Sequence, residues 1–217
     1  SHENWKKSLL TISPNGEQSK HQSSEQTIIV ENNSLLYFEK FWKREIQLIS
    51  LLSNRLNINL NIIERPVIEK VLKNVLEFNP VLYRGKPVIL SVEQKEAVLQ
   101  AISSPFSIVT GGPGTGKTSV ALTILRVHKM LGLAQRPALA APTGKAANRM
   151  SESVINGLNS IKDLNKLKHD MELLKFAADA KTLHRLLGYH PNRHSFRHHE
   201  YDPLEHDLLI IDEGSMI

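Results

Sequence analysis

The segment that most constrains the fold is the eight-residue run GGPGTGKT at Gly111–Thr118, in which four residues are glycine. It follows the apolar run FSIVT at Phe106–Thr110 and precedes a stretch with helical periodicity that extends to about Leu131. The run fits G-x-x-x-x-G-K-[ST], and a position between a strand and a helix is the context in which this pattern binds phosphate. Glycines let successive N–H groups face an anion, and the start of the helix adds partial positive charge. The sequence therefore predicts a strand–loop–helix unit that binds a phosphorylated ligand.

Two side chains of this loop carry specific chemistry. Lys117 can supply a full positive charge to the β- and γ-phosphates of a nucleotide, and the Thr118 hydroxyl can bind a magnesium ion. We therefore predict a site for ATP and Mg²⁺ in which Lys117 is catalytic. The residues predicted to contact the nucleotide are Gly111, Gly112, Pro113, Gly114, Thr115, Gly116, Lys117 and Thr118.

A pair of carboxylates follows the apolar run LLII at Leu208–Ile211. A buried parallel strand would deliver Asp212 and Glu213 to its carboxyl end, where open α/β sheets bind ligands. Asp212 can then hold the magnesium ion together with Thr118, and Glu213 can polarise an attacking water as a general base. The alternative is a strand that ends in two solvated acids, and the phosphate loop upstream favours the functional interpretation. Two adjacent acids indicate hydrolysis by water rather than transfer to a second substrate.

Gln94 admits two interpretations. In the run Ser91-Val92-Glu93-Gln94, Ser91 can cap a helix while the Gln94 side chain reaches back to the backbone. A glutamine amide can equally donate to and accept from the edge of adenine. The local pattern does not separate a helix cap from a nucleotide contact.

Strands that alternate with helices after residue 85 predict a parallel sheet with helices on both faces. We expect an α/β P-loop domain of the RecA-like type over residues 86–217, preceded by a small, mainly helical domain over residues 1–85. Helices are expected over about 35–56, 66–78, 91–102, 117–131, 144–158 and 163–179, and strands over 27–30 (paired near 9–12), 106–110, 137–141 and 208–211.

Composition narrows the class of protein further. The net charge of +5 favours a polyanionic partner such as nucleic acid, although a basic surface that binds nothing would give the same sum. There are no cysteines, so disulfides and zinc–thiolate sites are excluded. No apolar run approaches the roughly 18 residues that span a bilayer, and we find no secretory leader. We expect a cytoplasmic protein with no membrane partner, and a sequence that is the N-terminal part of a longer chain.

Five segments in a fixed order resemble one family. They are the VEQKEAV run that contains Gln94, the GGPGTGKT loop, APTGKAA at Ala141–Ala147, TLHRLLG at Thr182–Gly188 and DEGSMI at Asp212–Ile217. This order is similar to RecD-type superfamily 1 DNA helicases, the alpha chains of exodeoxyribonuclease V. The resemblance is strong over about residues 88–217, and LYFEKFWKRE at Leu36–Glu45 weakly resembles the helical N-terminal domain of that family.

The resemblance implies a motor that moves 5′ to 3′ on single-stranded DNA using ATP. It further implies double-strand-break repair and recombination, with duplex-end DNA and two partner subunits, a helicase–nuclease and a scaffold. It favours adenine contact for Gln94. By the same resemblance, DNA is contacted by Pro142, Thr143, Gly144, Lys145, Thr182 and His184. A Thr-Gly-Lys turn at a helix start does offer N–H groups, a hydroxyl and a cation to a backbone phosphate.

The sequence departs from the family pattern in two places, and the second departure limits the expected activity. Gly214 stands where the family usually has alanine or cysteine, which should loosen the turn but leave Asp212 and Glu213 in place. The second motor domain, with arginines that reach the γ-phosphate, is not in this sequence, and such arginines are worth about 10³–10⁵ in rate. We therefore expect these 217 residues to bind nucleotide without efficient hydrolysis.

Two rival functions remain open at this level. One is a P-loop phosphotransferase, which would need a small-molecule pocket and no Pro142–Lys145 or Thr182–His184 segment. The other is a docking subunit that holds nucleotide structurally. A cluster of histidines near His190 and His194 has the i,i+4 spacing of a metal site, but Pro191 and Asn192 favour an exposed hairpin.

Overall fold

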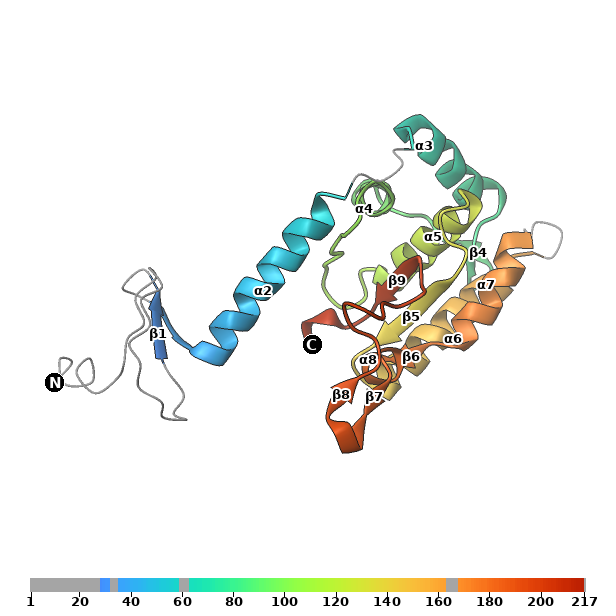
Figure 1. Ribbon diagram of the computed structural model, residues 1–217. Helices are drawn as coiled ribbons and strands as arrows, with labels where there is room; N and C mark the ends of the chain where they lie inside the picture. The colour runs from blue at the N-terminus through green and yellow to red at the C-terminus, as the bar shows by residue number, and fades with distance from the viewer. Residues whose placement is uncertain (1–27, 32–34, 59–62, 163–167, 217) are drawn as a thin grey trace. The chain divides into compact units, whose positions relative to one another are not determined.

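The computed structural model describes residues 28–31, 35–58, 63–162 and 168–216 (Figure 1). The chain divides into two compact units, Ser1–Ile58 and Asn59–Ile217. Within the described residues, no helix is both long enough and apolar enough to cross a bilayer.

The first unit contains a two-stranded sheet and one helix. Strand β1 (Ile28–Glu31) pairs antiparallel with β2 (Leu35–Phe38), and α2 (Glu39–Leu56) follows directly. Residues 35–38 were expected to be helical, but their backbone groups pair with β1 instead. The partner expected for this strand near 9–12 lies outside the described residues. No residue of α2 in this part of the chain is buried.

The second unit begins with helices that belong to the main core. Helix α3 (Arg65–Lys73) has Pro66 in its first turn, where a missing N–H costs nothing, and it continues as the π-helical turn η1 (Asn74–Phe78). Ile68, Leu72 and Val75 are buried in one cluster with residues of the next two helices, α4 (Val92–Ser103) and α5 (Lys117–Met130). The contacts therefore place the division of the chain at residues 58–59, whereas the sequence suggested a boundary near residue 85.

The remaining elements follow in chain order. A short hairpin of β3 (Leu82–Tyr83) and β4 (Lys86–Pro87) precedes α4. After α5 come β5 (Pro137–Ala141), α6 (Gly144–Ser160), α7 (Lys168–Ala178), β6 (Lys181–Thr182), α8 (Leu183–Leu186), the hairpin strands β7 (Tyr189–His190) and β8 (Ser195–Phe196) with the 3₁₀ turn η3 (Pro191–Arg193) between them, β9 (Leu208–Ile211) and the 3₁₀ turn η4 (Gly214–Met216). The expected bounds of β5 and β9 are confirmed, and α5 and α6 match expectation to within two residues.

The central sheet has the strand order β6-β5-β9, and both pairings are parallel (Figure 1). Ala141 of β5 lies opposite Thr182 of β6, and Ala140 lies opposite Ile211 of β9. All three strands therefore end at the same edge. The loops that leave this edge carry Pro142–Lys145, His184 and the acidic pair.

Both faces of the sheet are covered. All five residues of β5 are buried, and their side chains alternate between faces. Leu139 packs in a cluster with residues of α5, α6 and α7, whereas Ala138 and Ala140 pack with Leu186 of α8 on the other face. The α/β fold with helices on both faces of a parallel sheet is confirmed.

Two expectations for the strands are wrong. Phe106–Thr110 forms no strand, and Ile108 is 78% exposed. A strand exists only where its N–H and C=O groups pair with a neighbour, and no described segment is paired with this one. The second is the burial of β9, which is only partial: Leu208 and Ile210 face the core, while Leu209 and Ile211 on the other face are about 40% exposed.

Candidate functional site

The phosphate loop has the backbone geometry that its glycines predict. Gly114 and Gly116 have φ of +75° and +76°, a region that residues with a Cβ rarely adopt. Gly116 is the N-cap of α5 in this left-handed conformation. A Cβ at Gly116 would also lie 2.8 Å from the amide nitrogen of Gln94. Glycine is therefore required at residue 116 both by conformation and by space.

The N-terminus of α5 presents unpaired donors. Within the described part of the chain, the N–H groups of Gly114, Gly116, Lys117 and Thr118 make no hydrogen bond. The first N–H groups of a helix have no partner in the helix itself, and the aligned peptide dipoles add about half a positive charge there. Donors and dipole together form a site for an anion.

The ammonium group of Lys117 lies against this loop. Its Nζ donates to the carbonyl oxygens of Gly111 and Gly112, both at 2.7 Å. The Thr115 hydroxyl also donates to the Gly112 carbonyl, at 2.8 Å. The positive charge predicted for the loop is thus held beside the free N–H groups. Thr118, the second residue of α5, is exposed.

Gln94 forms the helix cap that was one of the two interpretations of its sequence, and it makes a further contact outside the cap. Its backbone N–H donates to Ser91 Oγ at 3.2 Å and its Oε1 accepts from the Ser91 N–H at 2.8 Å, which completes a capping box. The Ser91 hydroxyl in turn donates to Glu93, and this hydrogen bond lowers the pKa of that carboxyl. The Gln94 amide nitrogen also donates to the carbonyl of Thr115 in the phosphate loop, at 2.8 Å.

The acidic pair lies at the end of β9. The Asp212 N–H donates to the Ala140 carbonyl at 3.0 Å, which extends the pairing of β9 with β5. The Glu213 N–H donates to Asp212 Oδ1 at 2.9 Å. Glu213 has a φ of +53°, an uncommon value for a residue with a Cβ. Arg84 and His194 have similar values in turns of the described chain, and backbone strain of this kind is found both in tight turns and at functional sites.

The strand that carries the acidic pair packs in the same core as the helix that follows the loop, but no hydrogen bond joins the pair to the loop in the described residues. Ile210 of β9 packs against the cluster that contains Val120 and Ile124 of α5. In the described residues no hydrogen bond or ion pair links Asp212 or Glu213 to Lys117 or Thr118. The donor set of one hydroxyl, one carboxylate and one ammonium suits a nucleotide with magnesium.

The residues expected to contact DNA lie at neighbouring turns. Thr143 caps α6 by accepting from the Ala146 N–H at 3.2 Å, and Lys145 is exposed in the first turn. Thr182 caps α8 by accepting from the Arg185 N–H at 3.2 Å. Since Ala141 and Thr182 lie opposite each other in the sheet, the structure brings these two turns together.

His184 belongs to an aromatic cluster that the sequence did not predict. Its ring meets Tyr189 edge to face at 5.2 Å and Phe196 at 5.9 Å, and the latter two rings are 5.2 Å apart. Tyr189 and Phe196 come from the β7–β8 hairpin, which is the exposed hairpin expected for this region. His190 and His194 thus lie on a hairpin and not on one face of a helix.

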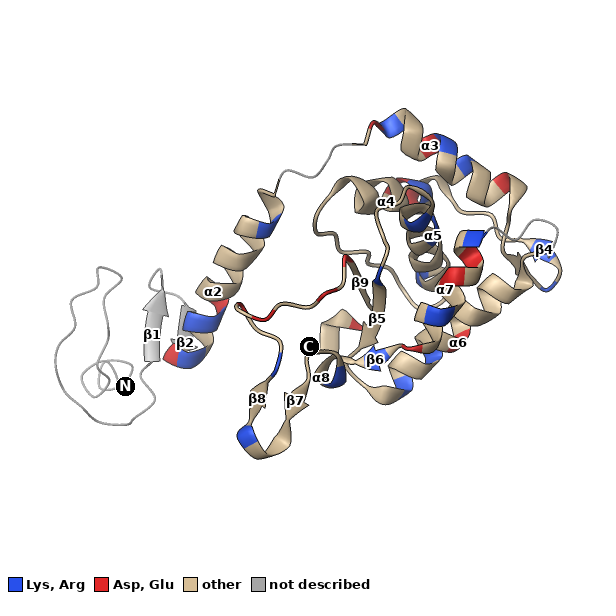
Figure 2. Ribbon diagram, turned by 45° about the vertical axis from the view of Figure 1, so that its right-hand side comes forward, with Lys and Arg blue, Asp and Glu red and all other residues tan. Residues whose placement is uncertain are grey.

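Surface charge does not by itself define an interface. Lys and Arg occur together with Asp and Glu on α3, α4 and α7 (Figure 2). The positive charge of the chain is therefore not confined to one element, and the argument for DNA contact depends on the individual turns.

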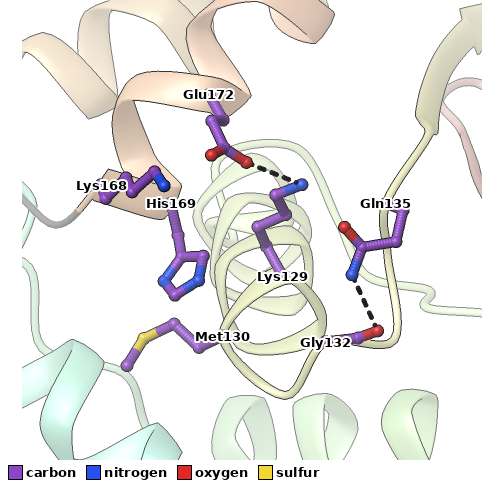
Figure 3. Close-up of a pocket in the computed structure, with 7 residues that line it drawn as sticks. All are labelled: Lys129, Met130, Gly132, Gln135, Lys168, His169 and Glu172. Carbon is purple, nitrogen blue, oxygen red and sulfur yellow. Dashed lines mark hydrogen bonds and ion pairs between the residues drawn. The ribbon is translucent and has the colours of Figure 1, made fainter.

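A cavity of about 200 Å³ lies at the opposite end of α5 from the phosphate loop, beside Lys129 (Figure 3). Lys129 is 4% exposed and pairs with Glu172 of α7 at 3.0 Å, and its ammonium lies 5.6 Å from the Phe176 ring. The Lys129 hydrogen bond lowers the pKa of Glu172. These contacts join α5 to α7, so the pair is structural.

The fold and loop define a class: a P-loop domain of the nucleotide-binding α/β type. A family described as "AAA domain" matches residues 94–217, and the chain belongs to this family. The resemblance to RecD-type helicases is confirmed by curated relatives. "RecBCD enzyme subunit RecD" of Haemophilus influenzae is 42% identical over 125 residues, which are 57% of this chain and 19% of that protein.

Two further relatives extend this comparison. "RecBCD enzyme subunit RecD" of Mycobacterium tuberculosis is 34% identical over 195 residues, covering 86% of this chain and 29% of that protein. "ATP-dependent RecD2 DNA helicase" of Deinococcus radiodurans is 38% identical over 128 residues, covering 59% of this chain and 14% of that protein. The chain thus spans less than a third of the length of these relatives.

Proposed function

We propose that this chain is the nucleotide-binding part of the first motor domain of an ATP-dependent DNA helicase, the RecD-type subunit of a recombination and repair exonuclease. The observation that carries this proposal is the set of N–H groups of Gly114, Gly116, Lys117 and Thr118, unpaired within the described residues, on the loop that also holds the Lys117 ammonium. The acidic pair at the end of β9 and the similarity to RecD sequences support it.

Bound ATP with Mg²⁺ supplies the phosphoanhydride whose cleavage drives movement. In the proposed site the loop N–H groups and Lys117 bind the phosphates, while the Thr118 hydroxyl and the Asp212 carboxylate hold the metal. Glu213 orients and deprotonates the attacking water. The second hydrogen of the Gln94 amide nitrogen remains for the edge of adenine.

The proposed DNA path crosses the two turns at the carboxyl edge of the sheet. Thr143, Gly144 and Lys145 contact one backbone phosphate through the start of α6. Pro142, Thr182 and His184 line the same path. The polarity implied by the resemblance is 5′ to 3′, and a cytoplasmic location fits a protein that works on DNA ends.

The first unit is proposed to dock the two partner chains of the exonuclease. Its helix α2 exposes large apolar side chains, among them Phe41 at 58% and Leu51 at 58%. Isolated apolar residues are ordinary on a surface. Along α2, however, no described residue is buried, so its apolar side chains are available to contact a partner chain. Charged replacements of Phe41 and Leu51 should abolish co-purification with the partner chains and leave nucleotide binding unchanged.

The decisive experiment is the ATPase rate of the full-length protein with and without single-stranded DNA, beside Lys117→Ala. We expect turnover that DNA stimulates and that the substitution removes. The 217 residues alone should bind ATP and hydrolyse it negligibly, because the arginines of a second motor domain are needed for rate. Turnover indifferent to DNA would favour a phosphotransferase. Sustained DNA-stimulated turnover by the 217 residues alone would contradict the second expectation.

A further inference from the structure

The Gln94 amide makes one contact that a helix cap does not require. A capping box uses the amide oxygen, which here accepts from the Ser91 N–H. The amide nitrogen instead reaches 21 residues along the chain and donates to the Thr115 carbonyl at 2.8 Å. One side chain therefore joins the first turn of α4 to the middle of the phosphate loop.

This contact fixes the direction of a phosphate-binding donor. The Thr115 carbonyl and the Gly116 N–H belong to one peptide unit, and in a planar trans peptide they point in opposite directions. When Gln94 holds the Thr115 oxygen towards α4, the Gly116 N–H must point away from α4. That N–H is one of the donors that have no partner in the described part of the chain.

The other side of Thr115 is also held. Its hydroxyl donates to the Gly112 carbonyl at 2.8 Å, so Thr115 is fixed by its side chain within the loop and by its carbonyl to α4. The backbone between Gly112 and Gly116 has little freedom left. Preorganised donors avoid the conformational cost of ordering the loop when a ligand binds.

We propose that Gln94 is a positioning residue for the phosphate loop, a role that rests on the proposed nucleotide site and is separate from any contact with the base. The amide has two hydrogens and its oxygen has two lone pairs. The contacts to Ser91 and Thr115 use one of each, so adenine recognition can coexist with them. The positioning role acts on every phosphate ligand, whatever base it carries.

The test uses a ligand that has no base. Binding of ATP, GTP and inorganic tripolyphosphate, each with Mg²⁺, is measured by calorimetry on the 217-residue chain and its variants. Gln94→Glu keeps an acceptor for the Ser91 N–H, and therefore the cap, but cannot donate to Thr115. Gln94→Ala removes the donor without adding charge. Loss of the hydrogen bond to the Thr115 carbonyl should weaken tripolyphosphate roughly 3- to 10-fold in Gln94→Ala, and GTP by a similar factor. Gln94→Glu should weaken both ligands at least as much, because its carboxylate also repels the phosphates.

Ser91→Ala is the matched control. It removes the capping hydroxyl but keeps the Ser91 N–H and the contact between Gln94 and Thr115. We expect lower stability to urea and unchanged binding of tripolyphosphate. If this variant weakens tripolyphosphate as much as Gln94→Ala does, the cap alone orders the loop and the positioning role is refuted.

The remaining outcomes are separable. Weaker ATP with unchanged tripolyphosphate in both Gln94 variants would show that Gln94 acts on adenine alone and would overturn the proposal. Unchanged binding of all three ligands would leave Gln94 as a cap and overturn it too. Lys117→Ala should weaken tripolyphosphate strongly. If it does not, or if the unaltered chain binds none of the ligands, the proposed nucleotide site fails and the inference fails with it.

Discussion

The buried ion pair between Arg126 and Asp170 gives the sharpest prediction of stability. Arg126 Nε and Nη2 donate to Asp170 Oδ1 and Oδ2, both at 2.8 Å, and each side chain is 1% exposed. The pair joins α5, the helix that begins at the phosphate loop, to α7. Removing Asp170 leaves the Arg126 guanidinium group buried with neither a carboxylate nor water to accept its hydrogen bonds. The other hydrogen bond of Arg126, to the Val75 carbonyl, is long at 3.4 Å.

The cost depends on whether one partner or both are replaced. Breaking a buried pair from one side costs about 3–5 kcal/mol, since an uncompensated charge stays buried. Each kcal/mol lowers Tm by roughly 2–4 °C in a chain of this size. Asp170→Leu should therefore lower Tm by roughly 6–20 °C. Replacing both partners by Met and Leu removes both charges, and such exchanges are often neutral.

These differences in the free energy of unfolding are measured by urea unfolding of the single variants Arg126→Met and Asp170→Leu and of the double variant. The control is the exposed pair of Arg136 and Glu205, also 2.8 Å long, whose side chains are 61% and 80% exposed. Arg136→Met should cost less than about 1 kcal/mol. A cost of Asp170→Leu as small as this control, or a double variant whose cost equals the sum of the singles, would refute the reasoning.

Three further measurements address the site and the core. Gly116→Ala should weaken tripolyphosphate binding at least about tenfold, because the new Cβ clashes with Gln94 and the left-handed conformation adds about 1–2 kcal/mol of strain. Gly132→Ala has the same strain but no neighbour within 4 Å, so it should leave binding unchanged, and equal loss in both variants would contradict this. In the full-length protein, Lys145→Ala should reduce the slope of log K for single-stranded DNA against log salt by about 0.7, the value of one phosphate contact, and an unchanged slope would remove Lys145 from the DNA path. Burial lowers the pKa of His128 below its ordinary value of 6.5, and a hydrogen bond within its helix and the charge of Asp207 offset part of this shift. As the pH falls, the unfolded chain therefore takes up this proton before the folded chain does. The free energy of unfolding should therefore fall as pH drops below about 6.5, and His128→Gln should make that fall shallower; parallel pH profiles would show that His128 does not contribute.

The conformation of the phosphate loop and the strands β5 and β9 could be predicted because their signals are local. The glycines of Gly111–Thr118 and the apolar run Leu208–Ile211 each specify a conformation with few alternatives. The cap at Ser91 and Gln94 was predictable for the same reason, since a capping box lies within four residues. The hairpin near His190 followed from Pro191, which cannot continue a helix.

The features that the sequence did not predict depend on distant partners. Phe106–Thr110 has strand composition, yet a strand also needs a paired neighbour. The contact from Gln94 to Thr115 and the ring contacts of His184 join residues that are not neighbours in the sequence, and no local pattern predicts such contacts. Periodicity shows that α3 is amphipathic but not which core its apolar face joins, so its packing against α4 and α5 could not be predicted.

The parallel pairing of β5 with β9 has a consequence for the order of folding. Pro137 lies opposite Leu208, so about seventy residues must be in place before this ladder can close. Contacts so far apart in the chain form slowly, whereas α3, α4 and α5 can pack while the C-terminal segments are still being synthesised. The phosphate loop is thus made and packed well before Asp212 and Glu213 exist. A nascent chain should acquire its anion-binding half first, and only the arrival of β9 completes the site.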